Sequence, residues 1–191
     1  MTEKLILKKI DNTAQITINN PSANTWDLES LSGLQDIIEN LNKDNEIFAL
    51  VITGQGDKFF SAGADLKVFH EGGKEAAKQM SNAFSKAFES LSNFRGVSIA
   101  AINGFAMGGG LECALACDIR VAEEKAVLAL PEPKVGLLPC GGGTQVLPRL
   151  VGEGWAKRII LTGEQIKAEQ ALKIGLICLL YTSPSPRDLA V

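Results

Sequence analysis

Histidine and paired cysteines are scarce in this chain of 191 residues, which contains one histidine and four cysteines. None of the cysteines forms a Cys-x-x-Cys pair. Because zinc is bound mainly by clustered thiolate and imidazole groups, we expect no metal site. Cys113 and Cys117 share a spacing that places both on one face of a helix, which favours buried thiols.

Long runs of one kind of residue are also absent. The formal net charge is −3 and no basic cluster occurs, so nucleic acid is not an expected partner. No apolar run is long enough to span a membrane, and the opening residues, MTEKLILKKIDNT, lack the apolar segment of a signal peptide. We therefore expect no membrane association and a bacterial cytoplasmic location, with an organellar matrix as the alternative.

The glycine clusters lack the patterns of nucleotide-binding loops. Gly54 and Gly56 are not followed by the third glycine of a G-x-G-x-x-G fingerprint, and no G-x-x-x-x-G-K-[ST] string occurs. The main sequence signals for nicotinamide chemistry and for nucleotide hydrolysis are therefore absent.

Short apolar runs of strand length alternate with segments that have helical spacing. This alternation predicts an α/β fold with largely parallel strands. A buried strand, a glycine-rich turn and a helix recur at 47–66, 97–117 and 127–150, which suggests a coil of similar units. Asp27 is the predicted N-cap of the first helix. The strands are expected at 5–10, 14–18, 47–53, 97–102, 119–122 and 126–130, with another beginning at 175–177, and the helices at 28–41, 75–94, 111–117, from 144, and at 164–174.

The last residues, LLYTSPSPRDLAV, show neither a helical nor a strand period. The string CLLYTSPSPRD resembles translated sequencing-adapter DNA. We therefore expect one core domain over 1–178 and a tail over 179–191 that is not native sequence. A disordered native tail is the alternative.

Two turns built from small residues are candidates for binding a negatively charged oxygen. Three glycines at 108–110 lead into a predicted helix, and 61–66 follows another predicted strand. Glycine allows a ligand to approach the backbone closely, and the first N–H groups of a helix have no partner within it. Two such N–H groups facing one carbonyl would form an oxyanion hole. A tight turn without a ligand is the alternative for each cluster.

Two glutamates stand beside these turns in apolar segments. Glu112 lies within GGGLECALA, and Glu132 lies between prolines in LALPEPKVGLL, where Pro131 and Pro133 predict non-helical backbone. Burial raises the pKa of a carboxyl, and two nearby carboxyls drive their pKa values apart, so such a pair can hold water and move a proton. For each glutamate alone, an acid at a helix start or in an exposed turn is the alternative.

Three segments resemble the crotonase, or enoyl-CoA hydratase/isomerase, family: FSAGADL at 60–66, INGFAMGGGLECALACDIRVA at 102–122 and PEPKVGLLPCGGGTQVLPRLVG at 131–152. The resemblance implies a spiral of ββα units with surrounding helices. It also implies an enoyl-CoA hydratase, a carbon–oxygen lyase that adds water across the C2=C3 bond of a trans-2-enoyl-CoA. No cofactor is implied, because coenzyme A is part of the substrate.

The resemblance assigns roles to individual residues. The backbone N–H groups of Ala64 and Gly109 would form the oxyanion hole. Glu112 would activate the water, and Glu132 would exchange a proton with the substrate carbon. Lys67 would meet a phosphate of coenzyme A, although a surface lysine is an equal alternative. The implied substrate-binding residues are Asn24, Ala62, Ala64, Asp65, Leu66, Lys67 and Gly109.

Two departures from the family pattern stand out. Cys140 precedes the glycines at 141–143, where hydratases of the family often have glycine, and it could narrow the space near the water or simply pack. Family members also continue into C-terminal helices that cover the acyl pocket and build a homotrimer or hexamer. This chain lacks them, so we expect a truncated C-terminal segment.

Two other functions compete with hydration. A Δ3,Δ2-enoyl-CoA isomerase would use the same oxyanion hole and Glu132 alone. A non-catalytic fragment that binds coenzyme A would need neither glutamate.

Overall fold

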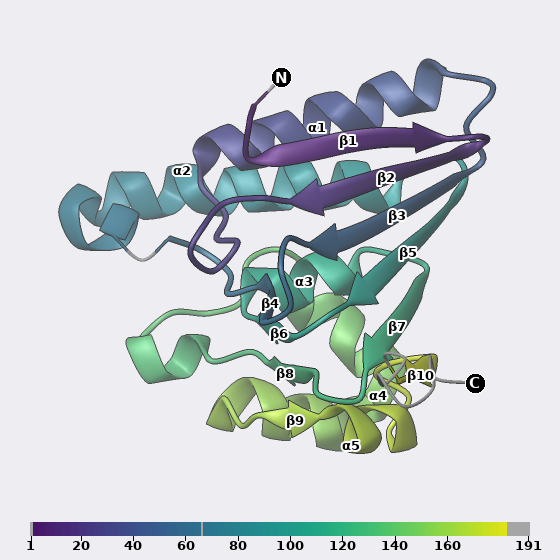
Figure 1. The fold of residues 1–191 in the computed structure, drawn as a ribbon. Helices are drawn as coiled ribbons and strands as arrows, with labels where there is room; N and C mark the ends of the chain where they lie inside the picture. Colours follow the sequence, from purple (N-terminus) through teal and green to yellow (C-terminus); the bar gives the residue numbers. More distant parts are fainter. Residues whose placement is uncertain (1, 66, 183–191) are drawn as a thin grey trace.

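The computed structural model describes residues 2–65 and 67–182, which form two β-sheets, five α-helices and one 3₁₀ helix (Figure 1). The six strands of the first sheet are β1 (Leu5–Ile10), β2 (Thr13–Ile18), β3 (Ala49–Gly54), β5 (Val97–Ile102), β7 (Ile119–Glu123) and β10 (Leu179–Tyr181). The second sheet contains β4 (Phe59–Ser61), β6 (Phe105–Met107), β8 (Val127–Ala129) and β9 (Ile166–Lys167). The helices are α1 (Leu28–Lys43), α2 (Lys67–Ser92), α3 (Gly109–Leu115), η1 (Glu132–Val135), α4 (Gly143–Thr162) and α5 (Ala168–Lys173).

The prediction of an α/β fold with largely parallel strands is confirmed. In the first sheet, β2, β3, β5, β7 and β10 are parallel neighbours, and only β1 runs antiparallel to β2. In the second sheet, β4, β6 and β8 are parallel, and β9 is antiparallel to β8.

Successive strands step from the first sheet to the second and then enter a helix. This happens in the order β3–β4–α2, then β5–β6–α3, and then β7–β8–η1–α4. The chain therefore follows a spiral of ββα units, as the sequence predicts. Glycine permits the close crossing between turns of the spiral: a Cβ on Gly104 would lie 2.2 Å from the Lys58 carbonyl oxygen.

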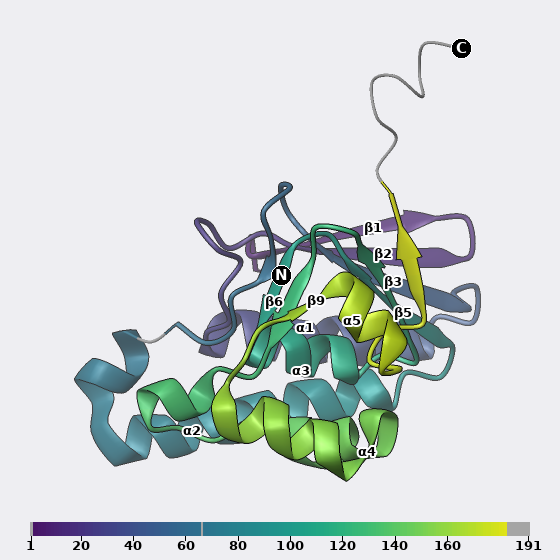
Figure 2. The same cartoon turned by 90° about the horizontal axis from the view of Figure 1, so that it is seen from below.

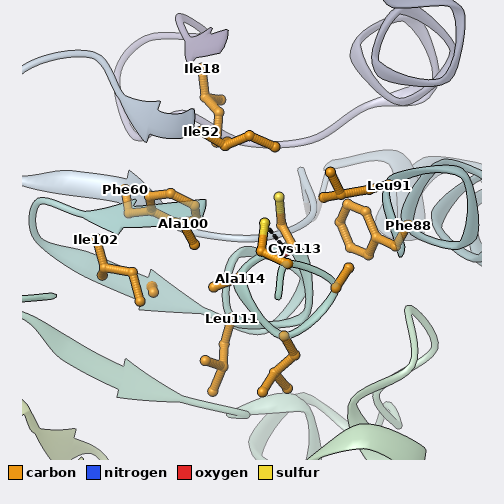
Figure 3. Packing of buried hydrophobic residues seen from close by; sticks show 14 of the residues in the cluster. Ile18, Ile52, Phe60, Phe88, Leu91, Ala100, Ile102, Leu111, Cys113 and Ala114 are labelled. Atoms are coloured by element: carbon orange, nitrogen blue, oxygen red, sulfur yellow. Dashed lines mark hydrogen bonds between the residues drawn. The ribbon is translucent and has the colours of Figure 1, made fainter. Parts of the chain in front are cut away.

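Helix α3 lies at the centre of the molecule. Figure 3 shows its apolar side chains surrounded by residues of the first sheet and of α2. All seven residues of α3 are buried, including Cys113, and Cys117 just beyond it is buried as well. The predicted pair of buried thiols is therefore confirmed. The predicted cap of α1 is also correct, because the Asp27 side chain accepts a hydrogen bond from the Ser30 N–H at 2.9 Å.

Helix α2 begins eight residues before its predicted start at 75. The segment consists of two helical parts joined by a kink at Gly73, whose φ of 61° and ψ of −155° are not helical, and the part after this glycine corresponds to the predicted helix. No helix of residues 2–65 and 67–182 combines the length and apolar character that a membrane span requires.

The prolines around Glu132 do not exclude helical backbone. Glu132 is the first residue of η1, with a proline at one of its first positions, where a missing N–H costs no hydrogen bond. The prediction of a non-helical segment is wrong for this reason.

The end of the described chain also differs from its prediction. Gly175 ends α5 with a φ of 78°, and the N–H groups of Leu176 and Ile177 then bond back to the Ala171 carbonyl. A strand therefore cannot begin at 175–177. It forms at β10, where Leu179–Tyr181 pairs with β7, inside the segment for which no regular structure was expected. Residues 183–191 of the expected tail lie outside the described residues.

The predicted helix over 164–174 is shorter than expected. Its early residues Ile166 and Lys167 pair with β8 as strand β9, and the helix α5 starts only at Ala168. A two-residue strand is too short to leave a period in the sequence.

Candidate active site

A cavity of about 600 Å³ lies between α2, the strand end at 62–65, the start of α3 and the segment 131–140. In Figure 1, α2 and the segment that follows β8 both extend to the same side of the molecule, and residues of both line this cavity. It is lined by Thr25, Ala62, Gly63, Ala64, Asp65, Ala77, Ser81, Phe84, Gly108, Gly109, Glu112, Pro131, Glu132, Lys134, Val135, Leu137, Leu138 and Cys140. The cavity therefore brings both predicted glutamates together with both predicted N–H donors.

The N–H of Ala64 is not used in the pairing between this residue and the segment that contains Trp26. Trp26 and Ala64 form an isolated parallel bridge in which the Trp26 N–H bonds to the Gly63 carbonyl and the Asp65 N–H bonds to the Trp26 carbonyl. In this pattern the Ala64 N–H takes no part. Within the described chain, neither Ala64 nor Gly109 donates its N–H to another backbone group. Both groups are therefore available to a ligand.

Glycine lets these two turns touch. Gly63 has a φ of 88°, and a Cβ there would lie 2.6 Å from the Met107 carbonyl oxygen and 3.1 Å from the Gly109 nitrogen. Any side chain at this position would separate the strand end that carries Ala64 from the turn that carries Gly109. The glycine thus keeps the two donors close enough to serve one oxygen atom.

Glu112 is held rigidly beneath the cavity. It is buried, with 2% of its surface exposed, and it projects from the central helix α3. Its Oε1 accepts hydrogen bonds from the backbone N–H groups of Gly141 and Gly143, both at 2.8 Å. Burial raises the pKa of this carboxyl, while the N–H groups of Gly143, Gly141 and Cys140 oppose the rise because they stabilise the anion.

Glu132 has very different surroundings. Burial, with a smaller contribution from the charge of Glu112, raises its pKa to about 7. Its Oε2 is buried, and no hydrogen-bond partner for that atom exists in the described part of the chain. The other oxygen faces Gly108, where an added Cβ would lie 2.9 Å from Oε1. Glu132 is therefore a carboxyl that accepts a proton readily at neutral pH.

The predicted substrate-binding residues divide into two groups. Ala62, Ala64, Asp65 and Gly109 line the cavity. Asn24 does not: it is 4% exposed, and its side-chain amide donates to the carbonyls of Gln55 and Phe59 at 3.0 and 2.9 Å. Asn24 thus links the loop before Trp26 to the backbone at Gln55 and Phe59. Its contact with substrate stays a prediction.

The structure does not fully describe two of the predicted substrate-binding residues. Leu66 and the side chain of Lys67 lie outside the described residues. The backbone of Lys67 begins α2.

The part of the cavity wall that α2 contributes was not predicted from the sequence. Ala77, Ser81 and Phe84 follow the helical spacing that places them on one face, and all three line the cavity. The Phe84 ring packs against Gly109, because a Cβ on that glycine would lie 2.6 Å from the ring. The sequence predicted a helix over 75–94, but none of these three residues was singled out as part of the site.

The arrangement suits acid–base chemistry next to a carbonyl. Two free N–H groups can hold a developing oxyanion, and two carboxyls of unequal environment can take up and release protons. Among the described residues, no three His, Cys, Asp or Glu side chains converge in a way that could hold a metal ion.

Comparison with known proteins agrees with this geometry. Residues 8–183 match the family described as "Enoyl-CoA hydratase/isomerase". A "Short-chain-enoyl-CoA hydratase" of Clostridium acetobutylicum is 41% identical over 174 residues, which cover 91% of this chain and 67% of that protein.

Solved structures show the same relationship. DspI of Pseudomonas aeruginosa has a TM-score of 0.94 and 63% identity, covering 99% of this chain and 78% of that one. An enoyl-CoA hydratase of Bacillus anthracis has a TM-score of 0.91 and 36% identity, covering 94% of this chain and 70% of that one. The sequence match over most of the chain, together with these structures, shows that the protein belongs to the enoyl-CoA hydratase/isomerase family.

Proposed function

We propose that the protein is an enoyl-CoA hydratase, which adds water across the C2=C3 bond of a trans-2-enoyl-CoA. The observation that carries the proposal is the pair of unlike carboxyls, Glu112 and Glu132, in one cavity with two free N–H groups. The names of the Clostridium and Bacillus relatives, both hydratases, support it.

The substrate's thioester carbonyl would bind to the N–H groups of Ala64 and Gly109. These donors polarise the carbonyl and make C3 electrophilic, and they stabilise the enolate that forms when C3 is attacked. Removal of one donor from such a site typically costs about 2.7–4 kcal/mol of transition-state stabilisation.

Glu112 would act on the water. Its carboxylate is fixed by the N–H groups of Gly141 and Gly143, which leaves Oε2 to accept a proton from a water molecule beside C3. As that proton moves to Glu112, the hydroxyl oxygen forms its bond to C3 and the π electrons move toward the carbonyl.

Glu132 would complete the addition. Because its pKa is about 7, a large fraction carries a proton at neutral pH, and that proton passes to C2 as the enolate collapses. The cycle closes when the proton taken up by Glu112 replaces the one that Glu132 has lost. Atoms balance, because one water is consumed and one hydroxyl and one hydrogen appear on the product.

The rest of the substrate would extend along the segment 61–67, with Lys67 near a phosphate of coenzyme A. No cofactor is needed, because coenzyme A belongs to the substrate. Family resemblance supports a homotrimer or hexamer and a bacterial cytoplasmic location for the complete protein.

The direct test is loss of the enoyl thioester absorbance when crotonyl-CoA is mixed with the protein. Glu153→Gln is a matched control, because Glu153 is an exposed residue of α4 whose ion-pair partner among the described residues is Lys157, at the surface. We expect wild type and this control to hydrate crotonyl-CoA. A folded protein that binds CoA thioesters without hydrating them would contradict the proposal, and conversion of a cis-3-enoyl-CoA would then identify an isomerase that relies on Glu132.

A further inference from the structure

Three buried aromatic rings form a chain that begins at the cavity wall. The centroid of the Phe88 ring lies 5.5 Å from that of Phe84 and 5.9 Å from that of Trp26, and both pairs meet edge to face. None of the three residues is more than 2% exposed. Phe84 and Phe88 lie one turn apart on α2, which packs against α3 (Figure 2), whereas Trp26 precedes α1. The rings therefore join segments that are far apart in the sequence.

The two outer members of this chain contact the two turns that carry the N–H donors. Phe84 packs against Gly109, because a Cβ on that glycine would lie 2.6 Å from the ring. The backbone of Trp26 forms hydrogen bonds on either side of Ala64. Each candidate donor of the oxyanion hole is thus attached to one end of the aromatic chain.

The middle ring contacts the backbone that binds Glu112. Phe88 projects from α2 toward the central helix α3 (Figure 3). A Cβ on Gly141 would lie 2.7 Å from the Phe88 ring and 3.0 Å from the Glu112 Oε2. The Gly141 N–H donates to the Glu112 Oε1 at 2.8 Å. Gly141 is therefore held between the ring on one side and the carboxylate on the other.

We propose that Phe88 is a positioning residue, which sets the distance between the Glu112 carboxylate and the oxyanion hole. It acts on Glu112 through Gly141, and on the donors through its two aromatic neighbours. Because protein interiors are close-packed, a smaller side chain at position 88 leaves space into which Gly141 or a neighbouring ring shifts. The inference rests on the proposed function, since it assumes that Glu112 activates a water beside a carbonyl bound by these donors.

Phe88→Leu tests the proposal, because it removes the ring and keeps most of the apolar volume. We expect kcat for crotonyl-CoA hydration to fall by about 10–100-fold, since a displacement of about 1 Å can cost about 10²-fold in rate. The value of KM should change little, because Phe88 does not line the cavity that would bind the substrate. Steady-state kinetics on the full chain separate the two effects.

Phe94→Leu is the matched control. Phe94 is also a buried phenylalanine, and its ring packs against a glycine outside the site, because a Cβ on Gly96 would lie 2.9 Å from it. Denaturant unfolding of both variants measures the loss of stability that they share. We expect kcat of Phe94→Leu to stay close to that of wild type.

A titration of the Glu112 carboxyl by NMR, assigned with Glu112→Gln, reports on the same contact without turnover. Burial raises the pKa of Glu112, and the Gly141 N–H is one of the donors that oppose the rise. Displacement of Gly141 in Phe88→Leu should therefore raise the pKa of Glu112 further, whereas Phe94→Leu should leave it unchanged. Two titratable groups that lie near this carboxyl are the same in both variants, namely Glu132 and Cys140.

Equal kcat values and equal Glu112 titrations in Phe88→Leu and Phe94→Leu would overturn the inference. Its failure is distinguishable from that of the proposed function. A wild type that hydrates crotonyl-CoA while the two variants behave alike contradicts only the inference. A wild type that does not hydrate crotonyl-CoA, combined with a higher pKa of Glu112 in Phe88→Leu, contradicts only the proposed function.

Discussion

Glu112 and Glu132 carry the same carboxyl group in two different surroundings. Glu112 projects from a buried helix and receives two backbone N–H groups at 2.8 Å. Glu132 starts a 3₁₀ helix at the cavity wall, and one of its oxygens has no hydrogen-bond partner among the described residues. Burial raises the pKa of both groups; the backbone N–H groups of Gly143, Gly141 and Cys140 oppose the rise at Glu112, whereas at Glu132 only its own backbone N–H does so.

The difference shows how one cavity can hold an acid and a base made from identical groups. N–H donors favour the charged form of a carboxyl, and an apolar site without donors favours the neutral form. The backbone that surrounds each glutamate therefore assigns its role. Experiments that change one glutamate, its surroundings or its protonation test this assignment.

The largest effect is expected from removing either carboxyl. Glu112→Gln and Glu132→Gln should each lower the rate of crotonyl-CoA hydration by about 10²–10⁴-fold, the range expected when a general acid or base is lost. Steady-state kinetics on purified, folded variants measure this, with Glu153→Gln as the control. If only Glu132→Gln impaired turnover, Glu112 would not be the base and the two-carboxyl account would be wrong.

The donors around Glu112 can be disturbed without changing the glutamate. A Cβ on Gly143 would lie 3.0 Å from the Glu112 Oε1, so Gly143→Ala should displace the carboxylate. A displacement of about 1 Å can cost about 10²-fold in rate, and we expect a loss in kcat of that order.

Gly154→Ala is the control for this substitution. Gly154 lies in the same helix α4, and no atom lies within 4 Å of its added Cβ. Equal kcat values for the two alanine variants would show that the donors do not hold Glu112 for catalysis.

Much of this comparison was accessible from the sequence. The alternation of strands and helices predicted the α/β spiral, and the apolar segments around both glutamates predicted raised pKa values. The donors were not predictable, because Gly141 and Gly143 are 29 and 31 residues from Glu112 and meet it only after the spiral has formed. Short-range rules failed at Glu132, where Pro133 was taken to exclude the helical turn that the structure contains.

The cavity wall from α2 illustrates a second limit. Ala77, Ser81 and Phe84 have the spacing of one helix face, but periodicity does not tell whether a face meets the core or a cavity. Only the position of the segment 131–140 opposite α2 reveals that this face lines the site.

The pH dependence of turnover follows from the acid role of Glu132. Its protonated form is needed, and that form is lost as the pH rises through about 7. The value of kcat/KM should therefore fall by about tenfold for each pH unit well above that point. A pH–rate profile on crotonyl-CoA checks this, and a rate that stays level up to pH 9 would contradict the acid role.

The smallest effect is expected on stability. A folded-state pKa of about 7, above the ordinary value of 4.5, means that folding is increasingly opposed as the pH rises between these values, because Glu132 must ionise in its buried site. Glu132→Gln should therefore stabilise the protein at pH 8 by about 1–3 kcal/mol and have little effect at pH 5. Denaturant unfolding at both pH values measures it, and a gain at pH 5 alone would reverse the predicted sign.

The most direct test of the central claim is a titration of the glutamate carboxyl carbons by NMR, with Glu132→Gln used for assignment. The account predicts one resonance that titrates near pH 7 in wild type and is missing from the variant. If every glutamate carboxyl titrated below about pH 5, close to the unperturbed value, the two surroundings would not distinguish an acid from a base and the account would be contradicted.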